Sequence, residues 1–206
     1  MINERLQEWG RAQARRVARW LRWTGLTPNM LTVLGLGLNC LVAVVLAAGH
    51  LFWGGVLVLL AGLFDLLDGA MARVTGRITS FGSFLDSTLD RYSEVVLYGG
   101  LLLYILSTPD AKVGAVLIYL TICGSILVSY ARARAEALGY KLQVGLLARP
   151  ERIIILAVGL MLHHVVWALW FLAIFTNLTA AQRIYHLWWT THRQHLPAGK
   201  RKDARP

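Results

Sequence analysis

Long apolar runs alternate with short polar or basic connections along most of the chain. A helix needs about 20 mainly apolar residues to cross the roughly 30 Å hydrocarbon core of a bilayer. Six runs approach this length, and the fifth is short and joins the sixth at His163–His164. The predicted spans are residues 30–49, 53–74, 82–107, 112–133, 151–165 and 166–188. The pattern predicts an all-α integral membrane protein with six transmembrane helices, with a hairpin of soluble helices as the alternative for the last two.

A different pattern precedes the first span. Residues 3–24 mix arginines with leucine, valine and tryptophan, which is typical of an amphipathic helix on a membrane surface. A soluble helix packed on a partner protein is the alternative. The Gly25–Asn29 stretch interrupts this segment, and we expect Thr27 to cap the first span with Pro28 at its first position. The chain thus divides into a juxtamembrane segment (1–29), a six-helix domain (30–190) and a basic tail expected to be disordered (191–206).

Composition and charge agree with a membrane protein. Apolar residues make up 56% of the chain and charged residues 16%, with a net charge of +10. The basic residues flank alternate connections, while the opposite connections hold only Lys112. This bias predicts a cell (inner) membrane protein with both termini and the active site in the cytoplasm. It also accounts for the charge without a nucleic-acid partner. No signal peptide is expected, and Cys40 and Cys123 are interpreted as small hydrophobic residues.

Four aspartates are the strongest chemical feature of the chain. Asp65 and Asp68 lie three residues apart at the end of the second span, and Asp86 and Asp90 lie four apart at the start of the third. Each pair therefore shares one helix face. A short loop should make the two helices antiparallel neighbours, so that the faces meet.

Clustered carboxylates in a membrane are unfavourable unless their charge is compensated. Two Mg²⁺ ions, or Mn²⁺ as the alternative, would balance four such charges with the oxygen ligands that these metals prefer. No histidine or cysteine lies at ligand spacing nearby, which argues against zinc. The alternative is four solvated aspartates at helix ends.

The aspartates belong to a longer motif. Residues 65–90 match Asp-x2-Asp-Gly-x2-Ala-Arg-x8-Gly-x3-Asp-x3-Asp at every fixed position. This resembles the signature of the CDP-alcohol phosphotransferase family, whose members are six-span membrane enzymes and usually homodimers. The resemblance implies transfer of the phosphatidyl group of CDP-diacylglycerol to an alcohol, with release of CMP. It makes Asp65, Asp68 and Asp86 metal ligands and Asp90 both a ligand and the general base. The residues implied to contact the CDP moiety are Gly69, Arg73 and Thr79.

Four further stretches bear on the acceptor. Residues 25–29, 129–136, 149–152 and 182–183 resemble those of bacterial phosphatidylinositol phosphate synthases within this family. The resemblance implies that inositol phosphate is the acceptor. It places Pro28, Asn29, Met30 and Leu31 near the CDP-lipid, and Ser129, Arg132, Arg152 and Arg183 around the acceptor phosphate. Arg132 departs from the lysine expected in the actinobacterial members and changes the donor geometry.

Other interpretations of these residues remain open from the sequence. Glycerol phosphate would suit the same cations, so phosphatidylglycerophosphate synthase is the second candidate. Arg183 could instead snorkel to the cytoplasmic interface, and Arg149 and Arg152 could be interfacial charges. The non-enzyme alternative is a transporter or channel with an acidic metal site. That alternative predicts polar residues or broken helices near mid-membrane, whereas this cluster lies at cytoplasmic helix ends.

Overall fold

The structure is a computed structural model that describes residues 23, 25–76, 79–142 and 144–194. Within these residues the chain forms six α-helices and no strand, which confirms the all-α prediction. In chain order the helices are α2 (Pro28–Ala47), α3 (Leu51–Thr75), α4 (Ser80–Ile105), α5 (Ala111–Ala137), α6 (Arg149–Met161) and α7 (Val165–Gln194).

Local signals set the helix boundaries that matter for the site. Thr27 caps α2 as predicted, because its hydroxyl accepts a hydrogen bond from a backbone N–H three residues on, and Pro28 is the first helical residue. Thr79 caps α4 in the same way through the N–H of Gly82, at 2.9 Å. Gly76 ends α3 with a φ of 66°, in the left-handed region that favours glycine. The α3–α4 connection is therefore short, because Gly76 ends the helix before it and Thr79 caps the helix after it.

Four helices, α2, α3, α5 and α7, are long and apolar enough to cross a membrane. The other two predicted spans fall short for different reasons. The part of α4 up to Glu94 carries the charged side chains of Asp86, Asp90, Arg91 and Glu94. The α6 helix has only 13 residues, which at 1.5 Å per residue is about 20 Å.

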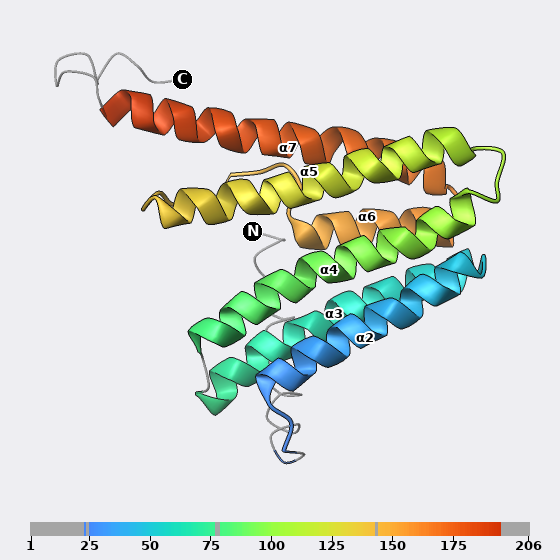
Figure 1. Ribbon diagram of the computed structural model, residues 1–206, viewed down its shortest axis with the longest axis horizontal. Coiled ribbons are helices and arrows are strands. Elements are labelled where there is room, and N and C mark those ends of the chain that lie inside the picture. Colours follow the sequence, from blue (N-terminus) through green and yellow to red (C-terminus); the bar gives the residue numbers. More distant parts are fainter. Residues whose placement is uncertain (1–22, 24, 77–78, 143, 195–206) are drawn as a thin grey trace.

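The helices pack in two groups, which Figure 1 shows as roughly aligned rods. In one group α2 packs against both α3 and α4, and in the other α5 packs against α7. The short α6 contacts α3 and α7, and α4 contacts α5, so these contacts join the groups. The beginnings of α2, α4 and α6 and the ends of α3, α5 and α7 lie at the same end of the bundle (Figure 1).

The largest cluster of buried apolar side chains holds the two groups together. Leu46, Leu101, Leu117, Leu160 and Leu169 belong to it, and each is at most 2% exposed. Gly100 lets α4 approach α2 closely, because a Cβ there would lie 2.2 Å from the carbonyl oxygen of Ala43. Many large apolar side chains face outward along the same helices, which suits a lipid environment better than water.

Two sequence predictions concern segments at the chain ends. The amphipathic helix over residues 3–24 lies outside the described residues, except for Trp23 and its exposed side chain. The predicted tail covers residues 191–206, and the part from residue 195 onward also lies outside the described residues. Residues 191–194 continue α7, so the predicted disorder is wrong for them, and the helix extends past the predicted end of the sixth span at residue 188.

Candidate active site

The two aspartate pairs lie on α3 and α4 at the end of the bundle where the connections carry most of the basic residues. The expectation that the aspartate faces of α3 and α4 meet is right for the side chains, because Asp86 on α4 interacts with Asp68 on α3. Within the described residues the backbones of the two helices make little direct contact, and each helix packs on α2 instead. The pairs therefore face each other across a space beside α2, and polar side chains and cavities occupy that space.

One arginine links the two pairs. Arg149, at the beginning of α6, donates a hydrogen bond to Oδ2 of Asp65 and forms an ion pair with Oδ1 of Asp90, each at 2.7 Å. Asp90 also lies 3.6 Å from the guanidinium of Arg91. Both bridged aspartates are mostly buried, at 16% and 19% exposure, so the pairing is shielded from bulk water. Arg149 thus acts as an internal counter-cation between α3 and α4.

The remaining two aspartates lie beside α2. Asp68 is 7% exposed, and its Oδ2 accepts a hydrogen bond from the hydroxyl of Thr32 at 3.0 Å. Its Oδ1 accepts from the backbone N–H of Gly69. Asp86 lines the same cavity as Asp68 and interacts electrostatically with it. These contacts place one carboxylate from α3 and one from α4 at the wall of a shared cavity.

The four carboxylates fit divalent metal ions by their chemistry, although the described residues hold no ready set of three metal-ligating side chains. Their donors are all oxygen, as Mg²⁺ and Mn²⁺ prefer. Arg149 pairs with Asp65 and Asp90, whereas Asp68 and Asp86 form no ion pair within the described residues, so half of the carboxylates have no cation in direct contact. Two of the four already bind that guanidinium, which explains why the ligands are not arranged around a common point.

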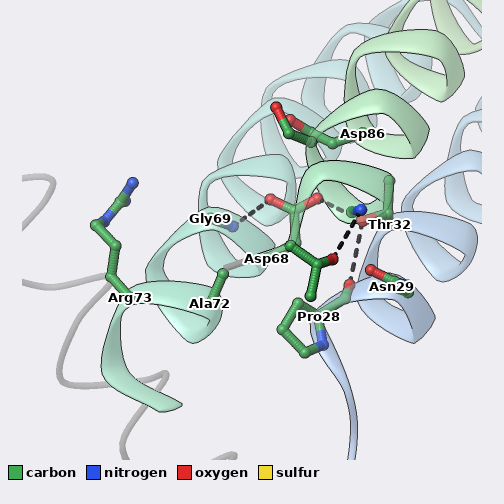
Figure 2. A pocket seen from close by; sticks show the side chains of 11 residues that line it. Pro28, Asn29, Thr32, Asp68, Gly69, Ala72, Arg73 and Asp86 are labelled. Carbon is green, nitrogen blue, oxygen red and sulfur yellow. Dashed lines mark hydrogen bonds between the residues drawn. The ribbon is translucent and has the colours of Figure 1, made fainter. Parts of the chain in front are cut away.

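The first cavity, of about 210 Å³, opens between α2, α3 and the start of α4 (Figure 2). The residues expected at the CDP-lipid that line it are Pro28, Asn29, Gly69, Arg73 and Thr79. Asp68 and Asp86 form its acidic wall. Gly82 keeps it open, because a Cβ there would lie within 3.0 Å of Thr79 Oγ1 and Asn29 Oδ1.

Two residues of the expected CDP-lipid group do not reach this cavity. Met30 is 49% exposed, and Leu31 is 2% exposed and packs with Ala70 and Met71. Each residue of a helix is turned about 100° from the one before, so only positions three or four apart share a face. Asn29 and Thr32 both face the cavity, and the two residues between them point elsewhere.

The second cavity, of about 110 Å³, lies where α4, α5, α6 and α7 converge. All four residues expected at the acceptor phosphate line it: Ser129, Arg132, Arg152 and Arg183. Asp90 and Arg149 line it too, so this cavity reaches the carboxylate cluster at Asp90, whereas the first reaches it at Asp68 and Asp86.

Arg183 and Arg152 are held inside the bundle. Arg183 is 7% exposed and donates to the backbone carbonyls of Val144, at 2.9 Å, and Val128. This geometry disagrees with a side chain that snorkels to the interface. Arg152 is 4% exposed and donates to Glu94 at 2.8 Å. Arg132, in contrast, is exposed and pairs with Glu136 one helical turn along α5.

Sequence reasoning did not assign Thr32, Glu94 or the bridging role of Arg149. A signal for Glu94 exists, because it lies four residues after Asp90 and continues the carboxylate face of α4. Thr32 likewise lies three residues after Asn29 on the cavity face of α2. No sequence signal joins Arg149 to its two aspartates, which come from other helices.

Comparison with known proteins agrees with this arrangement. The model of the CDP-alcohol phosphatidyltransferase family matches residues 25–190, more than half of the chain. A relative from Corynebacterium glutamicum, named phosphatidylinositol phosphate synthase, is 40% identical over 178 residues, covering 82% of this chain and 80% of the relative.

Solved structures are also similar. The crystal structure of Mycobacterium tuberculosis phosphatidylinositol phosphate synthase with CDP-DAG bound superposes with a TM-score of 0.79 at 34% identity, over 85% of this chain and 93% of that chain. The structure of the same enzyme with manganese and citrate gives a TM-score of 0.79 at 35% identity, over 85% and 88%. With the signature motif complete and its aspartates gathered between two cavities, the chain belongs to the CDP-alcohol phosphatidyltransferase family.

Proposed function

We propose that this protein transfers the phosphatidyl group of CDP-diacylglycerol to inositol phosphate, giving phosphatidylinositol phosphate and CMP. The observation that carries the proposal is the pair of cavities that share one carboxylate cluster, the first lined by Asp68 and Asp86 and the second by Asp90. One holds the signature residues Gly69 and Arg73, and the other is lined by buried arginines. A donor nucleotide and a phosphorylated acceptor would meet at the aspartates between them.

Asp65, Asp68, Asp86 and Asp90 would hold the divalent metal, which we propose to be two Mg²⁺ ions with Mn²⁺ as the alternative. When bound, these ions offset the negative charge of the diphosphate and of the CMP leaving group. A relative's structure contains manganese, which supports a divalent metal of this kind. Arg149 contacts both Asp65 and Asp90, so it would have to give up these contacts before the two carboxylates could bind metal.

The protein side chains would position the two substrates and move one proton. In the first cavity, Arg73 places a fixed cation at a phosphate of the CDP group. Asp90 lines the second cavity, and we assign it the general-base role. It takes the proton of the acceptor hydroxyl, whose oxygen forms the new bond to the lipid-bearing phosphorus. The bond from that phosphorus to the oxygen of CMP breaks.

The acceptor cavity supports a phosphorylated alcohol. Arg152 and Arg183 are at most 7% exposed, come from α6 and α7, and line the same small space with Arg132 and Ser129. Glu94 already compensates Arg152, but Arg183 bonds to neutral backbone carbonyls, so a phosphate with two negative charges would supply an anion beside it. The relative from Corynebacterium glutamicum, named phosphatidylinositol phosphate synthase, supports inositol phosphate over glycerol phosphate.

The membrane arrangement is part of the proposal. We infer that all six helices lie within the bilayer and that the active site faces the cytoplasm of an inner-membrane protein. Residues 1–29 would lie on the membrane surface and residues 191–206 would form the cytoplasmic tail. The outward apolar side chains of the described helices support burial in lipid, and part of that surface would pair two copies as a homodimer.

One assay tests the reaction and the acceptor together. Purified protein in detergent is incubated with CDP-diacylglycerol, Mg²⁺ and, in separate tubes, inositol phosphate, glycerol phosphate, inositol or serine. We expect release of CMP and a new lipid only with inositol phosphate. A product only with glycerol phosphate would replace the proposed acceptor, and no product with any alcohol would overturn the proposed activity.

A further inference from the structure

Glu94 is an acidic residue in a cavity lined by basic ones. It lies one helical turn beyond Asp90 on α4, after the signature motif has ended, and its side chain is 15% exposed. A carboxylate at this place would repel a phosphorylated acceptor if it pointed at the acceptor directly. Its contacts therefore decide what it can do.

Both carboxylate oxygens of Glu94 are already engaged. Oε1 accepts a hydrogen bond from Nη2 of Arg152 at 2.8 Å, and Oε2 accepts one from the hydroxyl of Ser125 on α5. The ion pair links α4 to α6, and the serine ties the carboxylate to a third helix. Ser125 thus fixes one carboxylate oxygen of Glu94, and the other oxygen binds Arg152.

The orientation of Arg152 depends on this contact. A small cavity of about 30 Å³ is lined by Arg152, Glu94, Arg149 and Asp65. Without Glu94, Arg152 could turn toward Asp65 and away from the acceptor cavity. A guanidinium has five N–H donors, so a bond from Nη2 to Glu94 leaves others for a phosphate.

Arg183 provides a comparison within the same cavity. It is also buried, at 7% exposure, but neutral backbone carbonyls of Val144 and Val128 hold it, and among the described residues it forms no hydrogen bond or ion pair with Glu94. The two buried arginines are therefore positioned by independent means. A buried ion pair often adds little net stability, so stability alone does not account for Glu94.

We propose that Glu94 is a positioning residue that aims Arg152 at the phosphate of the acceptor and thereby favours a phosphorylated alcohol. The inference rests on the proposed function, because it takes inositol phosphate as the acceptor. Glu94 itself makes no contact with the acceptor phosphate. Its effect on acceptor binding passes through Arg152.

The test is a double-mutant cycle measured in detergent-purified protein. The KM values for inositol phosphate and CDP-diacylglycerol and the kcat are measured for the wild type, Glu94→Gln, Arg152→Ala and the double variant. We expect Glu94→Gln to raise the KM for inositol phosphate about tenfold, the effect of one weakened charge-assisted hydrogen bond, while the KM for CDP-diacylglycerol changes little. In the Arg152→Ala background the same substitution should have no further effect.

Arg183→Ala is the matched control, since it removes a cation of the same cavity that Glu94 does not hold. Combining it with Glu94→Gln should multiply the two individual effects on KM. Equal effects of Glu94→Gln in the wild type and in Arg152→Ala would overturn the proposal, as would an unchanged or lower KM for inositol phosphate. A fall in kcat alone, with both KM values unchanged, would also contradict it.

A second variant covers a failure of Glu94→Gln to fold. Ser125→Ala keeps the charge of Glu94 but removes its other partner, so it should raise the KM for inositol phosphate by a smaller factor, again only while Arg152 is present. An unchanged KM in Ser125→Ala would overturn the proposal. If the wild type does not use inositol phosphate at all, the proposed function fails first. If the wild type does and the cycle shows no coupling, only the role of Glu94 fails.

Discussion

Removing Arg149 should make the carboxylate cluster bind divalent metal more tightly in the absence of substrates. Its guanidinium bonds to Asp65 and Asp90 at 2.7 Å each, and both carboxylates are mostly buried. A charge-assisted hydrogen bond of this kind contributes about 1.5–3 kcal/mol. A metal ion that takes over one of these carboxylates has to replace such a bond. Arg149→Ala removes that competition, so the Kd for metal should fall by about 10- to 150-fold for each bond replaced.

The assay is a titration of metal-free protein with Mn²⁺, in which the electron paramagnetic resonance signal of free Mn²⁺ reports binding. Arg132→Ala is the matched control, because Arg132 lines the second cavity but pairs with Glu136 rather than with an aspartate of the cluster. We expect the control to bind Mn²⁺ like the wild type. An unchanged or weaker Mn²⁺ affinity in Arg149→Ala would show that the arginine does not compete with metal, and would refute the reasoning.

Three further predictions test the site itself. Turnover should stop in EDTA and return with Mg²⁺ or Mn²⁺, and full turnover in the chelator would remove the metal from the proposal. Asp90→Asn should lower turnover by a factor of about 10²–10⁴, yet keep much of the CDP-lipid binding measured by ligand titration. Asp86→Asn should lower both turnover and CDP-lipid binding. Near-normal turnover in Asp90→Asn would assign the general base elsewhere. Arg183→Ala should raise the KM for inositol phosphate by about 10- to 150-fold with little change for CDP-diacylglycerol, and wild-type values for both would exclude Arg183 from the acceptor pocket.

The aspartate pairs illustrate how far local reasoning reaches. Spacings of three and four place each pair on one helix face, and both faces do line the site. A short connection requires α3 and α4 to run antiparallel, but it does not require them to touch. In the structure each packs on α2, and the space left beside α2 becomes the first cavity. The cavity thus depends on a third helix that the aspartate motif does not include.

The residues near the beginning of α2 show a second limit. Pro28 to Leu31 were expected as one group at the CDP-lipid, yet Asn29 lines the cavity, while Met30 faces outward and Leu31 is buried in the core. A motif read as a continuous stretch includes every side chain of a helical turn. The rotation of the helix on its neighbours selects which of them meet the ligand.

Local physical chemistry was enough to predict the helices, the Thr27 cap and the apolar surfaces, because each depends on residues within a few turns of one another. The tertiary structure alone placed Arg149 between Asp65 and Asp90, although Asp65 and Arg149 are 84 positions apart in the chain. It also paired Glu94 with Arg152. Such contacts depend on how far each helix slides and rotates against the next. The position and rotation of each helix are set jointly by many buried apolar side chains, so no single motif encodes them.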